Sequence, residues 1–407
     1  MKSVEEHLDA VLAGVRELPP FEQQLMDAHG CALCEDVTAG FDLPSFDNSA
    51  MDGYAVRAED VAHASEDAPV VLPVVGDLPA GGTQAHALAP GQALRIMTGA
   101  QVPRGSDTVI PVEWTDGGVA KVAIRRPPGD NSYIRRRGED IETGQLLVAS
   151  GTHLDAKQIA VLAAAGRDVV KVRPRPRVVV LSTGSELREP GQPLGEGLIY
   201  DSNSYTLAAA VREADGIAYR VGVVADDERT FMTVLEEQLV RADLVVTSGG
   251  VSVGAYDIVK QALRRLGTVE FTRVAMQPGM PQGFGVIGED RTPIFTLPGN
   301  PVSAYVSFQV FVRPALRAML GITPAVTPTV TATATTGWQA SEGRRQFTRV
   351  EYTVGPDGRG LVRPVSGPGS HLVGGLARAN ALAIVPEGVR EVPEGGAIEV
   401  MVLGAPR

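Results

Sequence analysis

The residues best suited to chemistry stand in a glycine-rich stretch at 247–254, with sequence TSGGVSVG. An apolar run at 244–246 precedes it, and a run with helical spacing at 256–263 follows it. A strand that ends in glycines and then opens a helix offers free N–H groups and the helix dipole to an anion. The stretch therefore predicts an anion site, although alone it leaves a plain strand-to-helix turn equally open. The contacting residues would be Ser248, Gly249, Gly250 and Ser252.

Two further stretches place small polar residues after predicted strands. The run at 178–181 leads into Thr183, Gly184, Ser185 and Glu186. The run at 294–297 leads into Pro298, Gly299, Asn300 and Pro301. Because ligands of parallel sheets bind at the carboxyl ends of the strands, three such ends together favour a ligand site over three unrelated turns.

Predicted strands and helices alternate around these stretches. The strands are at 178–181, 218–224, 244–246, 269–274 and 294–297, and the helices are at 202–214, 228–240, 258–266 and 302–320. This alternation predicts a mostly parallel, doubly wound sheet with helices on both faces. An amphipathic helix is also predicted at 3–18, and another helix at 153–166. Residues 57–145 predict short strands at 70–75, 92–97, 108–112 and 119–125.

Four acids follow the strands of the α/β region: Glu186, Asp226, Asp227 and Asp257. In one cleft, two like charges 4–5 Å apart would cost roughly 3–4 kcal/mol at an effective dielectric of about 20. A divalent cation would relieve that repulsion, and carboxylates without a His/Cys cluster favour Mg²⁺ over zinc. We therefore expect Mg²⁺ at Glu186, Asp226 and Asp257. Helix N-capping by Asp227 and Asp257 is the compatible structural alternative.

Arginines gather within an otherwise acidic chain, at 125–126 and 135–137. Phosphate or oxyanion binding by Arg136 and Arg137 is favoured over a solvated face paired with Glu139 and Asp140, because exposed pairs contribute at most about 1 kcal/mol each. No nucleophile–base pair is evident, so covalent acyl transfer is not expected.

Composition limits the function classes. The chain has 407 residues and a net charge of -11, which argues against a nucleic-acid partner held by bulk electrostatics. The N-terminus lacks the apolar core of a signal peptide, and no run reaches the roughly 18 apolar residues of a membrane span. We expect a cytoplasmic protein with no membrane contact. Cys31 and Cys34 form a CxxC, for which free thiols are favoured over a redox pair or half a zinc site.

Six motifs, in order along the chain, are the basis of a family resemblance. They are NSAMDGYA at 48–55, RIMTGA at 95–100, RGEDI at 137–141, STGSEL at 182–187, the stretch at 247–254, and LPGNPVS at 297–303. Together they resemble the signature set of the molybdopterin molybdenumtransferases, a family that includes the E domain of gephyrin. The resemblance implies insertion of molybdate into adenylylated molybdopterin with release of AMP, and dependence on Mg²⁺.

The resemblance also implies an α/β multidomain architecture, with β-rich domains inserted before the doubly wound sheet domain and a small C-terminal β domain. The expected division is an α/β molybdopterin-binding domain (1–20 and 172–322), a connecting mixed domain (21–42 and 141–171), a β-rich inserted domain (43–140) and a C-terminal β-barrel-like domain (323–407). A homodimer is implied, with the site between the α/β domain of one subunit and the Asp52/Thr98 region of the other. Contacts with the molybdopterin adenylyltransferase and with downstream molybdoenzyme maturation proteins are further expectations.

Site residues carry over position by position. The implied catalytic residues are Asp52, Thr98, Asp140, Glu186 and Asp257. The motif GRRQFTR at 343–349 implies that Arg345 and Arg349 bind substrate, and a Gly-Ser turn implies the same for Ser370. The chain departs from the family at Gln277 and Met280, where lysines usually flank Pro-Gly, and at 374–375, where Gly-Gly replaces Ser-Ser. The alternatives are a paralogue for another oxyanion such as tungstate, a non-catalytic scaffold of the gephyrin type, or another enzyme that binds a nucleotide or a pterin phosphate.

Overall fold

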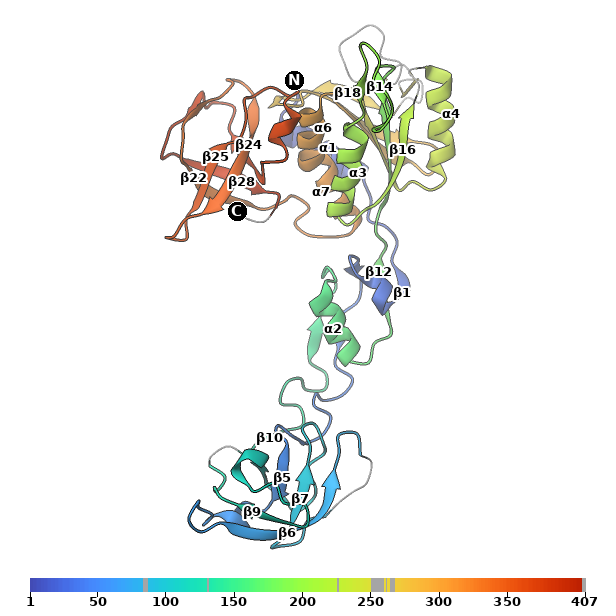
Figure 1. Cartoon of the computed structure of the whole chain (residues 1–407). Coiled ribbons are helices and arrows are strands. Elements are labelled where there is room, and N and C mark those ends of the chain that lie inside the picture. Colours follow the sequence, from blue (N-terminus) through green and yellow to red (C-terminus); the bar gives the residue numbers. More distant parts are fainter. Residues whose placement is uncertain are drawn as a thin grey trace. The chain divides into compact units, whose positions relative to one another are not determined.

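The computed structural model describes residues 1–82, 87–129, 132–224, 227–249, 260, 262–263 and 268–404. The chain divides into two compact units. Unit 1 comprises Met1–Glu35, Ser150–Ile159 and Val169–Arg407, and unit 2 comprises Asp36–Ala149 and Ala160–Asp168. The chain therefore starts in unit 1, leaves it and returns (Figure 1).

A six-stranded sheet in unit 1 has the strand order β16-β13-β17-β21-β20-β18. Its strands are β16 (Ile217–Val224), β13 (Arg177–Thr183), β17 (Leu244–Ser248), β21 (Thr292–Leu297), β20 (Pro281–Ile287) and β18 (Glu270–Arg273). The first four are parallel, whereas β20 and β18 are antiparallel to their neighbours. The sequence pattern missed β20, because glycines and a glutamine interrupt its apolar residues. Gly285 is required there, since a Cβ would lie 2.2 Å from the carbonyl oxygen of Thr268.

Alternating side chains of the sheet enter two separate cores. Val178 and Val180 of β13 pack in one core, with residues of α1 (Val4–Gly14), α3 (Asn203–Glu213), α6 (Pro301–Ser307) and α7 (Arg313–Met319). Val179 and Leu181 pack in the other core, with α4 (Glu228–Leu239). The period of two along a strand therefore places helices against both faces, as the alternation in the sequence predicted.

The single helix predicted at 302–320 is interrupted. A π-helical turn, Phe308–Val312, separates α6 from α7. Pro314 lacks the N–H that would bond to the carbonyl four residues earlier, which accounts for the irregular turn. At the other end of the chain, Ser3 and Glu6 form a capping box that fixes the start of α1.

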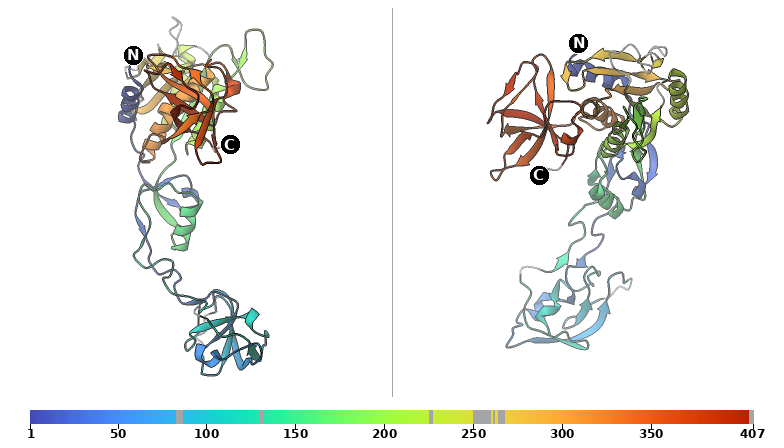
Figure 2. Two further views of the ribbon diagram at one scale, coloured as in Figure 1. Left: turned by 90° about the vertical axis from the view of Figure 1, so that its left-hand side faces the viewer. Right: turned by 45° about the horizontal axis from the view of Figure 1, so that its top comes forward.

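The C-terminal strands of unit 1 form a closed ring (Figure 2). Its strands are β22 (Thr329–Ala334), β24 (Arg345–Val354), β25 (Gly360–Pro364), β26 (Ala381–Val385) and β28 (Ala397–Val402). The ring closes because β24 pairs with both β25 and β26. A short strand from the α/β part, β19 (Met276–Gln277), pairs with the start of β24, so segments far apart in the sequence meet there.

Unit 2 is built on a five-stranded sheet of order β8-β5-β7-β6-β9. Its strands are β5 (Gly53–Val56), β6 (Val70–Leu78), β7 (Ala93–Ile96), β8 (Thr108–Pro111) and β9 (Lys121–Ile124), which confirms the strands predicted in this region. Two short pairs, β3 (Val37–Thr38) with β11 (Leu146–Val148) and β4 (Asn48–Ser49) with β10 (Ile134–Arg135), belong to the same unit.

The connecting segments have their own small sheet. It consists of β1 (Phe21–Gln24), β12 (Val169–Arg173) and β2 (Ala32–Leu33), and α2 (Ala156–Ala164) precedes β12 in the chain. Cys31 is buried and Cys34 is half-buried, both are free, and burial raises the pKa of each thiol. The predicted free thiols are thus confirmed, and their raised pKa values make them poor nucleophiles.

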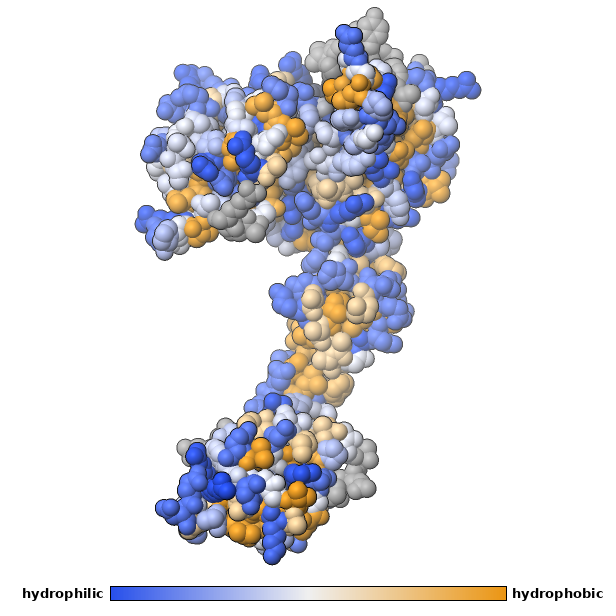
Figure 3. Space-filling model, in the orientation of Figure 1, coloured by the Kyte–Doolittle hydropathy of each residue, from blue (hydrophilic) through white to orange (hydrophobic). Residues whose placement is uncertain are grey.

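Apolar side chains on the surface are scattered. On the face drawn in Figure 3, hydrophilic residues predominate. In the part of the chain that the structure describes, no helix combines the length and the apolar character that crossing a membrane requires.

Candidate functional site

Three strand ends meet at one edge of the six-stranded sheet. Ser182 of β13 pairs with Ser248 of β17, which in turn pairs with Leu297 of β21. Gly249 follows with φ +93°, and a Cβ there would lie 2.7 Å from the carbonyl oxygen of Thr183. A Cβ on Gly299 would lie 3.7 Å from the Cα of Gly249. Gly249 after β17 thus lies close to Thr183 at the end of β13 and to Gly299 after β21, and the predicted convergence of the three strand ends is present in the described residues.

Asn203, the first residue of α3, ties two of these loops together. Its Nδ2 donates to Ser248 Oγ over 2.7 Å and to the carbonyl oxygen of Gly299 over 2.6 Å. The carbonyl can only accept, so the amide orientation is fixed. Because Ser248 Oγ accepts from Asn203, its own proton remains available to donate to a ligand. Asn203 Oδ1 is buried without a partner among the described residues.

The buried carboxylate of Asp201 connects the end of β13 to the start of α3. Asp201 is 1% exposed and accepts from Ser182 Oγ over 3.0 Å and from the backbone N–H of Ser204 over 3.0 Å. Asp201 thereby caps α3, whereas Ser202, the N-cap by position, makes no capping bond. The capping network anchors the helix that presents Asn203.

The predicted metal ligands are only partly described. Glu186 is exposed and its carboxylate lies against Gly184, where a Cβ would be 2.7 Å from Oε2. Asp226, Asp257, Gly250 and Ser252 lie outside the described residues. The described residues contain no group of three His, Cys, Asp or Glu that could hold a metal ion, so the Mg²⁺ site stays a prediction.

The capping role considered for Asp227 is confirmed. Its carboxylate accepts from the backbone N–H groups of Arg229 and Thr230, each over 3.1 Å, at the start of α4. Hydrogen bonds from Thr230 hold the pKa of Asp227 below its ordinary value.

A cavity of about 440 Å³ lies where β19, α6 and the loop before residue 372 come together. Its described lining residues are Met276, Gln277, Pro278, Gly279, Met280, Ser303, Arg344, Pro368, Gly369, Ser370 and His371. Arg344 is half-buried and has no ion pair with the described residues. A free guanidinium beside two hydroxyls, from Ser303 and Ser370, is suited to an oxyanion. We call this space the oxyanion cavity.

The predicted arginines, Arg345 and Arg349, are occupied elsewhere. Arg345 forms ion pairs with Glu5 and with Glu387, the latter over 3.2 Å. Arg349 is 4% exposed and donates to the carbonyl oxygens of Gly367, Gly369 and Leu372, over 2.7, 3.1 and 2.5 Å.

Neither arginine lines the oxyanion cavity, and Arg349 instead braces the turn that carries Ser370. The sequence interpretation missed Arg344. Arg344 lies in the bend just before β24, whereas Arg345 and Arg349 lie within the strand, so strand alternation does not separate Arg344 from the other two.

The departures from the lysine pattern lie in the cavity wall. Met280 accepts from Arg273 Nε through its sulfur over 3.2 Å, and Gln277 pairs with Gln346 in β24. At 374–375, where Gly-Gly replaces Ser-Ser, packing accounts for the glycine at 375, since a Cβ there would lie 2.4 Å from Ser366 Oγ.

In unit 2, Asp52 and Thr98 form a close pair. Asp52 Oδ1 accepts from the backbone N–H of Thr98 over 2.7 Å and from its hydroxyl over 2.8 Å. The backbone hydrogen bond is the main cause that lowers the pKa of Asp52. The sequence placed these residues 46 positions apart, and strands β5 and β7 bring them together.

The two arginines of unit 2 that were predicted to bind substrate, Arg136 and Arg137, are already paired with acids. Arg136 donates to Asp47 over 2.7 Å, and Arg137 donates to Asp42 over 2.6 Å. Hydrogen bonds from Thr143 and Arg137 lower the pKa of Asp42 to about 2. The guanidinium partners thus differ from Glu139 and Asp140, the partners considered from the sequence, although Glu139 accepts from the backbone N–H of Arg136 over 2.7 Å. Asp140 is exposed at the end of this loop.

Comparison with known proteins places this arrangement in a family. The MoeA N-terminal region (domains I and II) matches residues 2–166, a probable molybdopterin-binding domain matches residues 179–318, and the MoeA C-terminal region (domain IV) matches residues 331–403. Molybdopterin molybdenumtransferase 2 of Mycobacterium tuberculosis (strain H37Rv) is 47% identical over 406 residues, covering 98% of this chain and 99% of that protein. The chain belongs to the molybdopterin molybdenumtransferase family.

Other members of the molybdopterin molybdenumtransferase family agree along the full length. Molybdopterin molybdenumtransferase 1 of the same organism is 39% identical and covers 99% of both chains. A crystal structure of the molybdopterin biosynthesis MoeA protein from Pyrococcus horikoshii is 34% identical, covers 99% of both chains and has a TM-score of 0.78. The resemblance drawn from six motifs is confirmed, and so is a multidomain fold with mixed sheets and helices.

Proposed function

We propose that the chain is a molybdopterin molybdenumtransferase, which inserts molybdate into the dithiolene of adenylylated molybdopterin and releases AMP. The single observation that carries the proposal is the oxyanion cavity, where Arg344 lies with Ser303 and Ser370 in unit 1 of a family member. Molybdate is a tetrahedral dianion, so a guanidinium and hydroxyl donors suit it. With Gln277 and Met280 in place of lysines, Arg344 carries most of the attraction in this proposal.

The strand-end loops are proposed to hold the phosphate side of the substrate. Ser248 presents a free hydroxyl proton because Asn203 occupies its acceptor side. The positive φ of Gly249 lets a backbone N–H face the ligand without a Cβ in the way. Thr183, Gly184, Ser185, Pro298, Asn300 and Pro301 complete this cradle, together with Gly250 and Ser252.

A Mg²⁺ ion fits the exposed carboxylate of Glu186 at the rim, with Asp226 and Asp257 as the other proposed ligands. When bound, the ion would neutralise phosphate charge and so favour departure of AMP. Glu186 holds its carboxylate against Gly184, beside the cradle that would receive the phosphates. The Asp52–Thr98 pair, Asp140, Arg136 and Arg137 of a second copy are proposed to complete the site in a cytoplasmic homodimer. The four-domain division and contacts with proteins that supply the substrate or receive the cofactor belong to the same proposal.

The test is cofactor formation from adenylylated molybdopterin with either molybdate or tungstate. We expect turnover with molybdate, and an Asp257→Ala variant should lose it. Wild-type turnover in Asp257→Ala would remove Asp257 from the site. Substrate binding without any turnover would favour the non-catalytic scaffold.

A further inference from the structure

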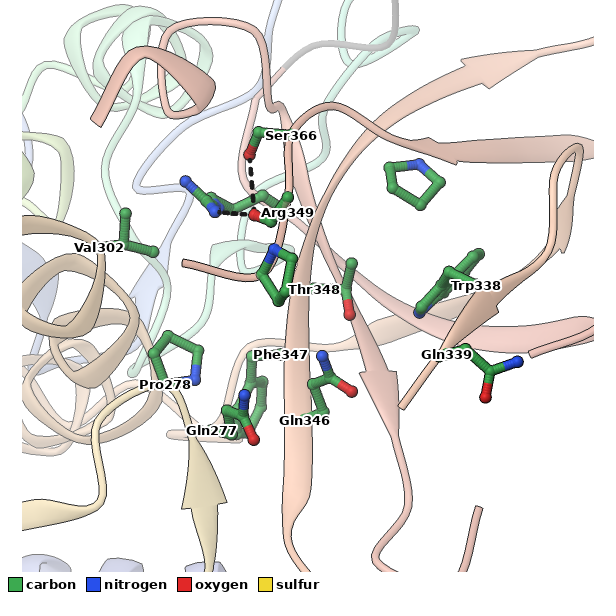
Figure 4. Close-up of a pocket in the computed structure, with 13 residues that line it drawn as sticks. Gln277, Pro278, Val302, Trp338, Gln339, Gln346, Phe347, Thr348, Arg349 and Ser366 are labelled. Atoms are coloured by element: carbon green, nitrogen blue, oxygen red, sulfur yellow. Dashed lines mark hydrogen bonds between the residues drawn. The ribbon is translucent and has the colours of Figure 1, made fainter. Parts of the chain in front are cut away.

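A second cavity adjoins the oxyanion cavity. It has a volume of about 300 Å³ and shares Gln277, Pro278 and Pro368 with its neighbour. Its other wall is formed by strand β24 and by β23 (Trp338–Gln339) (Figure 4). We call it the Trp338 cavity. Its volume is at the lower end of the range of small-molecule sites, about 300–1,000 Å³.

The described lining of the Trp338 cavity offers no free charge. Arg349 is its only charged side chain among the described residues, and three backbone carbonyls occupy that guanidinium. Trp338 and three prolines, Pro278, Pro364 and Pro368, contribute apolar surface. Charged ligands would lose hydration here without compensation, whereas a neutral molecule with flat faces would not.

Two polar atoms of the lining have no partner. Trp338 Nε1 and Thr348 Oγ1 are both buried without a hydrogen bond to any described residue. In Figure 4 the nitrogen end of the indole faces the side of the cavity where Thr348 lies. An indole N–H can only donate, so it needs an acceptor that the described chain does not supply. Buried unpaired donors are costly, and a ligand that satisfies them gains that free energy.

Amide side chains extend this polar edge. Gln346 accepts from the backbone N–H of Ser341 over 3.3 Å, which orients its NH₂ group as a donor. Gln277 and Gln339 contribute two more amides to the lining. Amides pair well with heterocycles whose edge carries both an acceptor and a donor.

We propose that the Trp338 cavity binds a neutral planar heterocycle with an amide-like edge, such as a pterin or a purine ring. The acceptor edge of the ring receives hydrogen bonds from Trp338 Nε1 and Thr348 Oγ1, and the ring faces contact the proline side chains of the lining. The inference rests on the proposed function in one respect, namely that the ring belongs to the substrate whose other part lies near the oxyanion cavity. Because the two cavities share three residues, ring and oxyanion can belong to one substrate.

The chain has two tryptophans, which makes the test direct. Trp114 lies in unit 2 and packs edge-on against Tyr133, so a Trp114→Phe variant leaves Trp338 as the single indole and its cavity unaltered. The full-length variant is titrated separately with pterin and with adenosine while its fluorescence is recorded, corrected for absorption by the ring. We expect saturable quenching by one of them.

Matched variants in the Trp114→Phe background test the hydrogen bonds. Thr348→Val removes the hydroxyl at nearly constant volume and should weaken ring binding about tenfold. Thr353→Val, on the same strand but outside the cavity lining, should leave the affinity unchanged. Calorimetry on Trp338→Phe, which keeps an aromatic ring but loses the N–H, should show a similar tenfold loss.

Quenching by pterin alone assigns the cavity to the pterin part of the substrate, and quenching by adenosine alone assigns it to the nucleoside. No quenching by either ring, or equal affinities for Thr348→Val and Thr353→Val, would overturn the inference. Molybdate turnover without ring binding would refute this inference but not the proposed function, whereas ring binding without turnover would do the reverse.

Discussion

At the scale of single residues, charge in the oxyanion cavity depends on Arg344. Arg344→Gln should weaken molybdate binding by roughly ten- to a hundredfold, because a hydrogen bond to a charged group contributes about 1.5–3 kcal/mol. Arg345→Gln is the matched control, since its guanidinium is held by Glu5 and Glu387. Calorimetric titration with molybdate measures both. Equal losses of molybdate affinity in the two variants would show that Arg344 does not bind molybdate in the oxyanion cavity.

A buried histidine makes stability depend on pH. His7 is 3% exposed, its ring contacts Phe311 edge-on with centroids 4.7 Å apart, and burial lowers its pKa from 6.5 to about 4. A depressed folded-state pKa gives stability that is present above pH 6.5 and is lost as the pH falls towards 4. The loss should approach about 3 kcal/mol.

Urea unfolding at pH 7 and pH 4.5 tests this prediction. The wild type should lose more stability between the two values than His7→Leu does, whereas the exposed His63→Gln should behave like the wild type. An identical pH dependence in wild type and His7→Leu would contradict the burial argument.

Site residues could be predicted from the sequence where the residue type itself indicates a role for the backbone, as glycine does at the end of a strand. Gly249 and Ser248 follow an apolar run, and their position at a strand end needs no tertiary information. Asn203 and Arg344 were missed for the opposite reason. Asn203 acts through contacts 45 and 96 positions away. Arg344 lies in the bend before β24, and no local pattern distinguishes it from Arg345.

At the scale of elements, the close packing of strand-end loops can be disturbed by one methyl group. Gly249→Ala combines a positive φ with a Cβ only 2.7 Å from the carbonyl oxygen of Thr183, so it should destabilise the fold by more than about 1 kcal/mol and weaken AMP binding. Gly191→Ala is the control, because its φ is +90° but nothing lies within 4 Å of the added Cβ. Thermal unfolding and AMP titration should separate the two, and equal effects would exclude the steric explanation.

The hydrogen bond between Asn203 of α3 and Ser248 at the end of β17 predicts that the two residues act together in binding. Asn203→Asp replaces the NH₂ donor by a carboxylate, which repels the carbonyl oxygen of Gly299. The carboxylate also accepts a hydrogen bond from the Ser248 hydroxyl, so that proton is no longer available to the ligand. We expect at least a tenfold loss of AMP affinity, and little further loss when Ser248→Ala is added. Additive losses in the double mutant would mean that Asn203 does not act through Ser248.

Elements with strong periodicity were predicted well, and the misses have physical reasons. The strands around 178–181 and 244–246 are continuous apolar runs, as a sheet buried on both faces requires. Strand β20 was hidden by Gly283 and Gly285: a Cβ on Gly283 would meet the side chains of Phe271 and Thr296, and a Cβ on Gly285 would meet the backbone of Thr268. Pro314 broke a helix whose apolar pattern runs on without interruption.

At the scale of the whole molecule, composition and motif order indicated a multidomain α/β chain of this family, which the comparisons confirm. The pairing of β19 with β24 could not be predicted from the sequence, because it joins segments about 70 residues apart and no local pattern indicates it. Residues of β19 and of β24 or the bend before it line both the oxyanion cavity and the Trp338 cavity, so the proposed site exists only in the folded chain.

The central proposal is that this chain inserts molybdate into adenylylated molybdopterin and releases AMP. Measuring AMP release together with cofactor formation tests it most directly. The full-length protein is mixed with adenylylated molybdopterin and Mg²⁺, with or without molybdate, and AMP and molybdenum cofactor are quantified together. We predict equimolar AMP and cofactor that depend on molybdate and fall at least tenfold in Arg344→Gln when molybdate is below saturation. Release of AMP without cofactor, or the absence of both from a protein that binds the substrate, would contradict the account.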